Sequence, residues 1–262
     1  MLAVNLLLVR ADEVIDGLCT LSDRRADHLR NVLRVQIGQV VRAGVLGGPL
    51  AAAEVVADDS AALIVRLTPM ASPPPALPLE LVIAVPRPKV VSRVIESCAA
   101  FAVRSVALTN SWRVDKSYLR SPRLEPSALA HAALLGAEQG ATTHLPALSV
   151  HDRFMDLLDE RYAHGASGLR LVAHPGAPPI ETVATTFPEA LAVGPEGGWI
   201  ERELATFAAR GFVPCSLGTP TLRVEAAVAA LLGQLLLIQR SANVRQIATS
   251  IIRKLPSSNK RE

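Results

Sequence analysis

Residues Leu191–Trp199 read LAVGPEGGW, an apolar run followed by a glycine- and proline-rich loop. The pattern predicts a buried strand over Ala190–Val193 and a helix over Trp199–Arg210. Glycines let main-chain amides approach a ligand closely, and free N–H groups at a helix start suit an acceptor-rich group. The spacing is not the G-x-G-x-x-G of dinucleotide-binding folds, and Pro195 removes a donor. By itself such a loop is more often an ordinary turn.

Two similar turns follow other predicted strands. Ser216–Arg223 reads SLGTPTLR after a strand predicted over Phe212–Leu217, and Val172–Gly176 follows a strand predicted over Leu169–Ala173. Ligands of α/β sheets bind at the carboxyl ends of the strands. We therefore expect the three turns to converge on one ligand pocket.

The region after residue 78 alternates between strand and helix patterns, which predicts an α/β fold with a mostly parallel sheet. The remaining elements expected there are strands over Leu79–Val85 and Val103–Leu108 and helices over Val90–Phe101, Pro126–Glu138 and Leu222–Arg240. The last helix is apolar on most faces. A helix of this kind is buried in its own domain or in a subunit interface.

The region before residue 68 predicts a small β-rich module. Its expected elements are strands over Val4–Val9, Gln39–Ala43, Leu50–Val56 and Ala61–Leu67 and a helix over Ser22–Leu33 with Ser22 as its N-cap. Thr68–Pro78, TPMASPPPALP, holds five prolines in eleven residues and is expected to be a stiff, unpaired linker. The predicted boundaries are 1–68 for the module, 69–78 for the linker, 79–245 for the α/β domain and 246–262 for a polar tail.

Composition excludes a disordered chain, because 50% of the 262 residues are hydrophobic and 19% are charged. Only 3% are aromatic, which argues against base stacking on an aromatic sheet. The net charge of +3 hides two basic clusters: eight basic and two acidic residues between 84 and 123, and five arginines and one acid between 24 and 42. They predict contact with a polyanion or, alternatively, solvated charged faces.

The three cysteines, Cys19, Cys98 and Cys215, lack metal-ligand spacing, so neither a metal site nor a disulfide framework is expected. No apolar run of about 18 residues is evident, and membrane association is not expected. Met1–Val9 lacks the basic start of a signal peptide. The expected location is cytoplasmic.

Four segments together resemble one family: HLRNVLRVQIGQVV near the N-terminus, VPRPKVVSRVIESCAAFAV after the prolines, VGPEGGW, and LGTPTLRVEAAVAALL. They are similar, in order and over nearly the whole chain, to the ribosomal RNA small subunit methyltransferase E family, SPOUT-class enzymes that methylate N3 of a uridine in 16S rRNA. The resemblance implies an N-terminal PUA-like β-barrel and an α/β domain whose trefoil knot binds S-adenosylmethionine. It also implies a homodimer that acts on the small ribosomal subunit.

The resemblance also implies site residues. Those expected at the cofactor are Leu171, Val172, Ala173, His174, Val193, Gly194, Pro195, Glu196, Gly197, Gly198, Leu217, Gly218, Leu222 and Arg223. Those expected at RNA are Arg24, Arg25, His28, Arg30, Arg34, Arg87, Lys89 and Arg113. Methyl transfer to a nitrogen requires alignment and no metal.

Three residues are candidates for catalysis. Uracil N3 is protonated at neutral pH, so a cation that stabilises the developing anion, or a base that removes the proton, assists the reaction. Arg223 is the first candidate for that cation, with Glu196 or Glu225 orienting it; alternatively, Arg223 and Glu225 form a structural ion pair.

The chain departs from the family pattern at Pro220, Val224 and Ala226, where an arginine and two threonines are usual. Two other functions therefore stay open. One is a catalytically weak or silent RNA-binding relative, and the other is a methyltransferase acting on another RNA position, such as a ribose 2′-hydroxyl.

Overall fold

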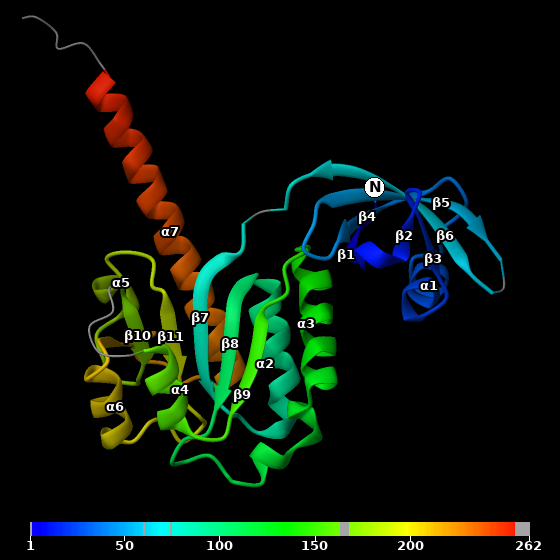
Figure 1. The fold of residues 1–262 in the computed structure, drawn as a ribbon. Helices are drawn as coiled ribbons and strands as arrows, with labels where there is room; N and C mark the ends of the chain where they lie inside the picture. The colour runs from blue at the N-terminus through cyan, green and yellow to red at the C-terminus, as the bar shows by residue number, and fades with distance from the viewer. Residues whose placement is uncertain (1, 60, 74, 163–167, 255–262) are drawn as a thin grey trace, which may run out of the picture.

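The computed structural model describes residues 2–59, 61–73, 75–162 and 168–254 of the chain. Two six-stranded sheets divide the described residues into an N-terminal unit, residues 2–71, and a parallel-sheet unit, residues 77–254 (Figure 1). The segment between them runs from Ser72 to Ala76. Hydrophobic alternation dominates the first unit and continuous apolar strands dominate the second.

The N-terminal sheet has the strand order β1-β4-β5-β6-β3-β2. β1 pairs with β4 in parallel, and the other neighbours are antiparallel. Alternate residues of β5, such as Ala51, Ala53 and Val55, are buried, as expected of a half-covered strand. The strands are β1 Leu2–Val9, β2 Val14–Ile15, β3 Leu18–Leu21, β4 Val40–Val45, β5 Leu50–Asp58 and β6 Leu63–Ala71. A short 3₁₀ turn, η1, covers Ala11–Glu13.

The helix predicted over Ser22–Leu33 begins one residue later than expected and changes type. α1, Arg24–Asp27, is capped by Asp23, whose carboxylate accepts the Arg25 N–H at 2.9 Å. Aspartate and serine are about equally good N-cap residues, so the cap moves by one position without loss. A π-helical turn, η2, then covers His28–Val32. The short strands β2 and β3 were not predicted.

The predicted linker of residues 69–78 is too long. Pro69 lies in β6 opposite Ala51, and Pro78 lies in β7. β3 pairs with β6 only as far as Arg66, so β6 is an edge at Pro69 and needs no N–H there. Pro78 precedes the first residue that pairs with β11, Glu80. Proline is compatible with a strand at both positions because no ladder donor is lost.

The second sheet is parallel throughout, in the order β12-β10-β11-β7-β8-β9, which confirms the α/β prediction. Its strands are β7 Leu77–Ala84, β8 Val103–Thr109, β9 Ala147–His151, β10 Arg170–Ala173, β11 Ala190–Val193 and β12 Phe212–Cys215. Its α-helices are α2 Pro88–Ala100, α3 Pro126–Gly140, α4 Phe154–Arg161, α5 Ile180–Val183, α6 Glu201–Ala208 and α7 Val224–Lys254. The 3₁₀ turns η3 and η4 cover Tyr118–Arg120 and Pro122–Leu124. Neither β9, α4 nor α5 was predicted.

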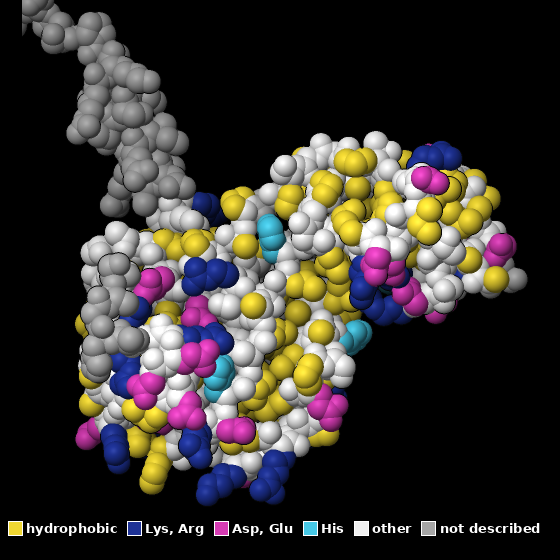
Figure 2. Space-filling view, in the orientation of Figure 1, with side chains coloured by type: hydrophobic (Ala, Val, Ile, Leu, Met, Phe, Trp, Pro, Cys, Tyr) yellow, Lys and Arg dark blue, Asp and Glu magenta, His cyan; other side chains and the backbone are white. Residues whose placement is uncertain are grey.

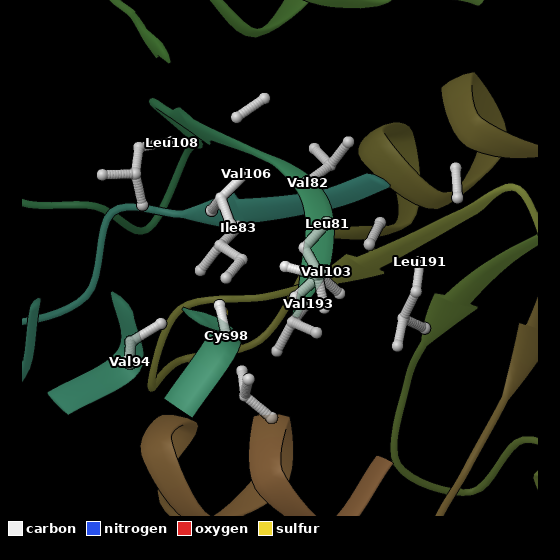
Figure 3. Close-up of a cluster of buried hydrophobic side chains, with 14 of the residues drawn as sticks. Leu81, Val82, Ile83, Val94, Cys98, Val103, Val106, Leu108, Leu191 and Val193 are labelled. Atoms are coloured by element: carbon white, nitrogen blue, oxygen red, sulfur yellow. The ribbon is translucent and has the colours of Figure 1, made fainter. Parts of the chain in front are cut away.

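The core of this unit is aliphatic. Leu81 and Ile83 of β7 are fully buried beside Val94 and Cys98 of α2 and Leu191 of β11 (Figure 3). α2 also packs against α3 and α7. This packing holds the carboxyl ends of the strands in fixed register.

α7 buries Val228, Leu231, Leu232 and Leu235 in that core, and its later turns project away from the sheet (Figure 1). The window Val224–Ser241 is long and apolar enough to span a membrane. The sequence prediction concerned uninterrupted apolar runs, and Glu225 and Arg240 keep the apolar stretch inside this window shorter than 18 residues. The window therefore qualifies by length and mean composition only, a test that the core helix of a folded domain can also pass.

The two units contact each other through β1 and α3. Leu6 and Leu8 pack on Ala137, and Arg24 pairs with Glu138 at 2.6 Å. Thr143 closes the contact: its Oγ1 donates to the Gly48 carbonyl at 2.8 Å, and its own carbonyl accepts the Gly47 N–H at 2.8 Å. A Cβ atom on Gly44 would lie 2.5 Å from Thr143 Cγ2. The units therefore meet through a close-packed interface.

Candidate functional site

The loops after β10, β11 and β12 line one pocket. These strands are neighbours in the sheet, so their carboxyl ends lie at the same edge. The pocket has a volume of about 610 Å³, and the start of α7 forms its remaining wall through Val224, Ala227 and Leu231. The predicted convergence of three turns is confirmed. The volume is that of a small-molecule site.

Hydrogen bonds join the loops after β10 and β12 into one wall. The His174 N–H donates to the Cys215 carbonyl at 2.8 Å, and the Ser216 N–H donates to the Pro178 carbonyl at 2.8 Å. The Ser216 hydroxyl donates to the Ala177 carbonyl at 2.8 Å. Main-chain groups on this wall are thus fixed by their neighbours, and pre-formed walls reduce the ordering cost of binding.

Glycines in the loop after β11 are favoured by limited space at Gly194 and by backbone conformation at Gly198. A Cβ atom on Gly194 would lie 3.3 Å from the indole of Trp199. Gly198 has a φ of +72°, a left-handed conformation, and its N–H donates to the Pro195 carbonyl at 2.8 Å. The sequence GPEGGW therefore folds as a tight loop over the Trp199 ring.

The pocket walls are mainly apolar. The ionisable side chains that line it are Arg113, His174 and Glu196. Two buried ring nitrogens of its walls, His174 Nδ1 and Trp199 Nε1, have no hydrogen-bond partner among the described residues. Buried polar groups usually have partners, so these atoms favour a ligand with polar edges inside an apolar cavity.

Most residues expected at the cofactor line this pocket: Ala173, His174, Val193, Gly194, Pro195, Glu196, Gly197, Gly198, Leu217, Gly218 and Leu222. Leu171 and Val172 lie earlier in β10, are buried in the sheet and do not line it. The sequence interpretation missed Trp199, Pro179 and the α7 residues. The spacing of Val224, Ala227 and Leu231, three and four residues apart, is a signal for one helix face.

The three candidate catalytic residues are not together. Glu196 is exposed at the pocket rim, where its Oε1 accepts the Arg87 N–H at 3.1 Å. Arg223 is exposed and Glu225 half-buried, and neither lines the pocket. In the part of the chain that the structure describes, Arg223 forms no ion pair with Glu225.

Arg113 brings a guanidinium to the pocket instead. It follows β8, and its side chain donates to the Gly197 carbonyl. A Cβ atom on Gly197 would lie 3.0 Å from Arg113 Cδ, so the glycine lets the arginine pack on the loop. Arg113 had been predicted at RNA, and the structure places it at the mouth of the pocket.

The other residues predicted at RNA divide into two groups. Arg24 pairs with Glu138, Arg25 with Glu13 and Asp23, and Arg30 with Asp58. His28 and Arg24 line a separate pocket of about 310 Å³ between the two units. By contrast, the side chains of Arg34, Arg87 and Lys89 are exposed and have no ion pair within the described ranges.

Among the described residues, no group of three His, Cys, Asp or Glu side chains is arranged to hold a metal ion. All three cysteines are buried and unpaired, and burial raises the pKa of the Cys215 thiol to about 12. A protonated thiol is a poor nucleophile and a poor metal ligand.

A family model described as an RNA methyltransferase domain matches residues 73–236. "Ribosomal RNA small subunit methyltransferase E" of Treponema pallidum is 27% identical, over 87% of this chain and 88% of its own length. "Ribosomal RNA small subunit methyltransferase E 1" of Borreliella burgdorferi is 25% identical, over 87% of this chain and 95% of its own. The crystal structure of a ribosomal RNA small subunit methyltransferase E from Neisseria gonorrhoeae, bound to S-adenosyl methionine, has the same fold. It aligns with a TM-score of 0.72 and 18% identity, over 89% of this chain and 98% of that one.

Proposed function

Because the chain belongs to the RNA methyltransferase domain family, we propose that it transfers a methyl group from S-adenosylmethionine to N3 of a uridine in 16S rRNA. The observation that carries the proposal is the pocket built by the loops after β10, β11 and β12. The names of the relatives from Treponema pallidum and Borreliella burgdorferi support small-subunit ribosomal RNA as the substrate.

The finer architecture is part of the same proposal. The N-terminal unit is a PUA-like barrel that contacts RNA, and the loops around the pocket form a trefoil knot. The protein acts in the cytoplasm as a homodimer. The apolar α7, with Leu237 56% exposed beyond the buried turns, is consistent with a subunit interface.

The residues of the pocket fit the cofactor. Its apolar walls suit an adenine ring, and its main-chain groups suit the polar edges of adenosine. Val193, Leu217 and Leu231 would pack on the ring, and the loop from Gly194 to Gly198 would hold the remainder. When bound, S-adenosylmethionine supplies an electrophilic methyl group.

Within this proposal Arg113 replaces Arg223 as the first candidate for the stabilising cation. Loss of the N3 proton leaves negative charge on uracil, and a guanidinium at the pocket mouth stabilises it. The bond from Arg113 to Gly197 holds the guanidinium beside the loop. Glu196 fixes the adjacent start of α2 through the Arg87 N–H. Arg223 and Glu225 stay predictions.

The test of cofactor binding uses two neighbouring alanines of α7. Ala227 lines the pocket, whereas Ala226 is exposed and does not. We expect calorimetry to show S-adenosylmethionine binding to the wild type and to Ala226→Phe and none to Ala227→Phe. No heat of binding to the wild type would end the proposal, and equal binding to both variants would move the cofactor out of this pocket.

The position of the methyl group is tested on small-subunit RNA from cells that lack this chain. We expect the purified protein to create a single reverse-transcription stop at a uridine, because a methyl group on N3 blocks base pairing. A product that pairs normally but resists alkaline cleavage would instead identify ribose methylation. RNA that binds without modification in the presence of the cofactor would identify a silent relative.

A further inference from the structure

A second hollow of the parallel-sheet unit is basic. It lies between the first turns of α2 and the turn η4 and has a volume of about 620 Å³. Its lining consists of Pro88, Lys89, Ser92, Arg93 and Glu96 on one side and Ser121, Pro122 and Arg123 on the other. We call it the α2–η4 groove.

The cations of the α2–η4 groove are free. Lys89, Arg93 and Arg123 are exposed, and their side chains make no ion pair or hydrogen bond within the described part of the chain. Glu96 is the acidic residue in its lining, so the groove carries three positive charges against one negative charge. Unpaired guanidinium and ammonium groups attract polyanions without first giving up a protein partner.

The chemistry of the lining indicates phosphate rather than bases. No aromatic side chain is among the lining residues, so the groove offers no surface for base stacking. Ser92 and Ser121 add hydroxyl groups beside the cations. Hydroxyls and cations on one surface are typical contacts to a sugar–phosphate backbone.

The α2 wall of the groove lies next to the pocket. Arg87, directly before α2, donates its N–H to Glu196 at the pocket rim at 3.1 Å. Arg113, on the segment that leads to η4, lines the pocket and donates to Gly197. A nucleic-acid chain with one base at the pocket therefore has the groove beside its flanking nucleotides.

We propose that the α2–η4 groove binds the phosphates of the RNA that flank the nucleotide held at the pocket. The inference rests on the proposed function and assigns Arg93 and Arg123, together with Lys89, to substrate binding. The contact is independent of base sequence and contributes to RNA affinity, not to cofactor affinity. It is consequently sensitive to salt.

The experiment compares two triple variants of the full chain with equal charge. The groove variant is Lys89→Gln, Arg93→Gln and Arg123→Gln, and the control is Arg104→Gln, Arg153→Gln and Arg202→Gln. The control residues are exposed and line neither the groove nor the pocket. Binding of a small-subunit RNA fragment is measured at about five KCl concentrations, roughly between 50 and 300 mM. The kcat and KM of RNA methylation and the affinity for S-adenosylmethionine are measured for the same proteins.

We expect the groove variant to bind RNA roughly 10- to 100-fold more weakly, with the slope of log affinity against log salt reduced by about 2. KM for RNA rises while cofactor affinity stays unchanged. Lysine instead of glutamine at these two positions (Arg93→Lys and Arg123→Lys) recovers most of the RNA affinity, because a point charge suffices for phosphate. Equal RNA affinity and equal salt dependence in the two triple variants would overturn the proposal that the groove binds RNA. An inactive wild type that does not bind S-adenosylmethionine would overturn the proposed function instead.

Discussion

The two basic clusters of this chain look alike in sequence and differ in structure. In the cluster at residues 24–42, three of the five arginines are held by carboxylates from other segments. In the cluster at residues 84–123, none of the basic residues has an ion pair in the described part of the chain. In the space-filling view, basic and acidic side chains lie against each other beneath the N-terminal unit, whereas basic side chains protrude at the lower edge of the other unit (Figure 2).

Local charge density therefore does not identify a polyanion site. Arg24 finds its partner 114 residues away, and Arg30 finds its partner 28 residues away. Such partners neutralise three of the five arginines and make them cross-links of the fold. A phosphate would have to displace Glu138 or Asp58 to reach them, whereas Lys89, Arg93 and Arg123 have no partner to lose.

The largest effect is expected at Arg113, which belongs to the unpaired cluster and also lines the pocket. Arg113→Ala should lower kcat for methylation by about 10²- to 10³-fold, because a preorganised donor to developing charge is removed. RNA affinity should change less than fivefold, by roughly the value of one phosphate contact. Single-turnover rates and equilibrium binding on the same RNA check this. An unchanged single-turnover rate would exclude Arg113 from charge stabilisation.

The next effect is a loss of folding stability when an ion pair of the cluster at residues 24–42 is broken. Arg25 is 12% exposed and donates to the Leu8 carbonyl, Glu13 and Asp23. Arg25→Ala should reduce the free energy of unfolding by about 2–3 kcal/mol, because two carboxylates lose their partner. Urea denaturation measures it. In the matched control, Arg10→Ala breaks the exposed pair with Asp12 and should leave the free energy of unfolding nearly unchanged.

Lowering the pH should weaken the ion pairs of the cluster at residues 24–42, whereas the cluster at residues 84–123 has no ion pair to lose among the described residues. The hydrogen bond from Arg25 lowers the pKa of Glu13. Burial alone would raise the pKa of Asp23, but hydrogen bonds from Arg25 outweigh it and lower the pKa. Folded pKa values below the unfolded ones mean that this stability is fully present above about pH 5 and is lost as the pH falls through the folded values.

The check is urea unfolding of the N-terminal unit, monitored by amide NMR signals, between about pH 3 and 7. The wild type should lose stability toward pH 3 more steeply than Arg25→Ala does. Parallel curves for the two proteins would show that Arg25 is not the source of the pH dependence.

The smallest effect is expected from Arg30. Because Asp58 holds its guanidinium at 2.7 Å, Arg30→Gln should change RNA affinity less than about twofold. Asp58→Asn should free the arginine and raise RNA affinity by roughly two- to threefold at low salt. Filter binding at about 50–100 mM salt, below physiological ionic strength, tests both changes. A tenfold loss in Arg30→Gln would mean that paired arginines also serve RNA.

Much of the fold was predictable because local patterns determine it. Ala190–Val193 is a strand over the predicted residues, and the turn residues after β10, β11 and β12 lead to one pocket. Ala147–His151 was missed because β9 is a sheet edge with no fully buried residue and therefore no apolar run. Tertiary pairing was not predictable at all: no local signal connects Arg24 to Glu138 or Arg113 to Gly197.

The contact between Gly44 and Thr143 constrains how the chain can vary. Any side chain at position 44 would meet the Thr143 methyl group, which cannot turn away without giving up the bond to Gly48. Relatives with alanine at the equivalent of position 44 should therefore carry glycine or serine at the equivalent of position 143. A chimera that joins this N-terminal unit to another catalytic domain would need the two positions transplanted as a pair.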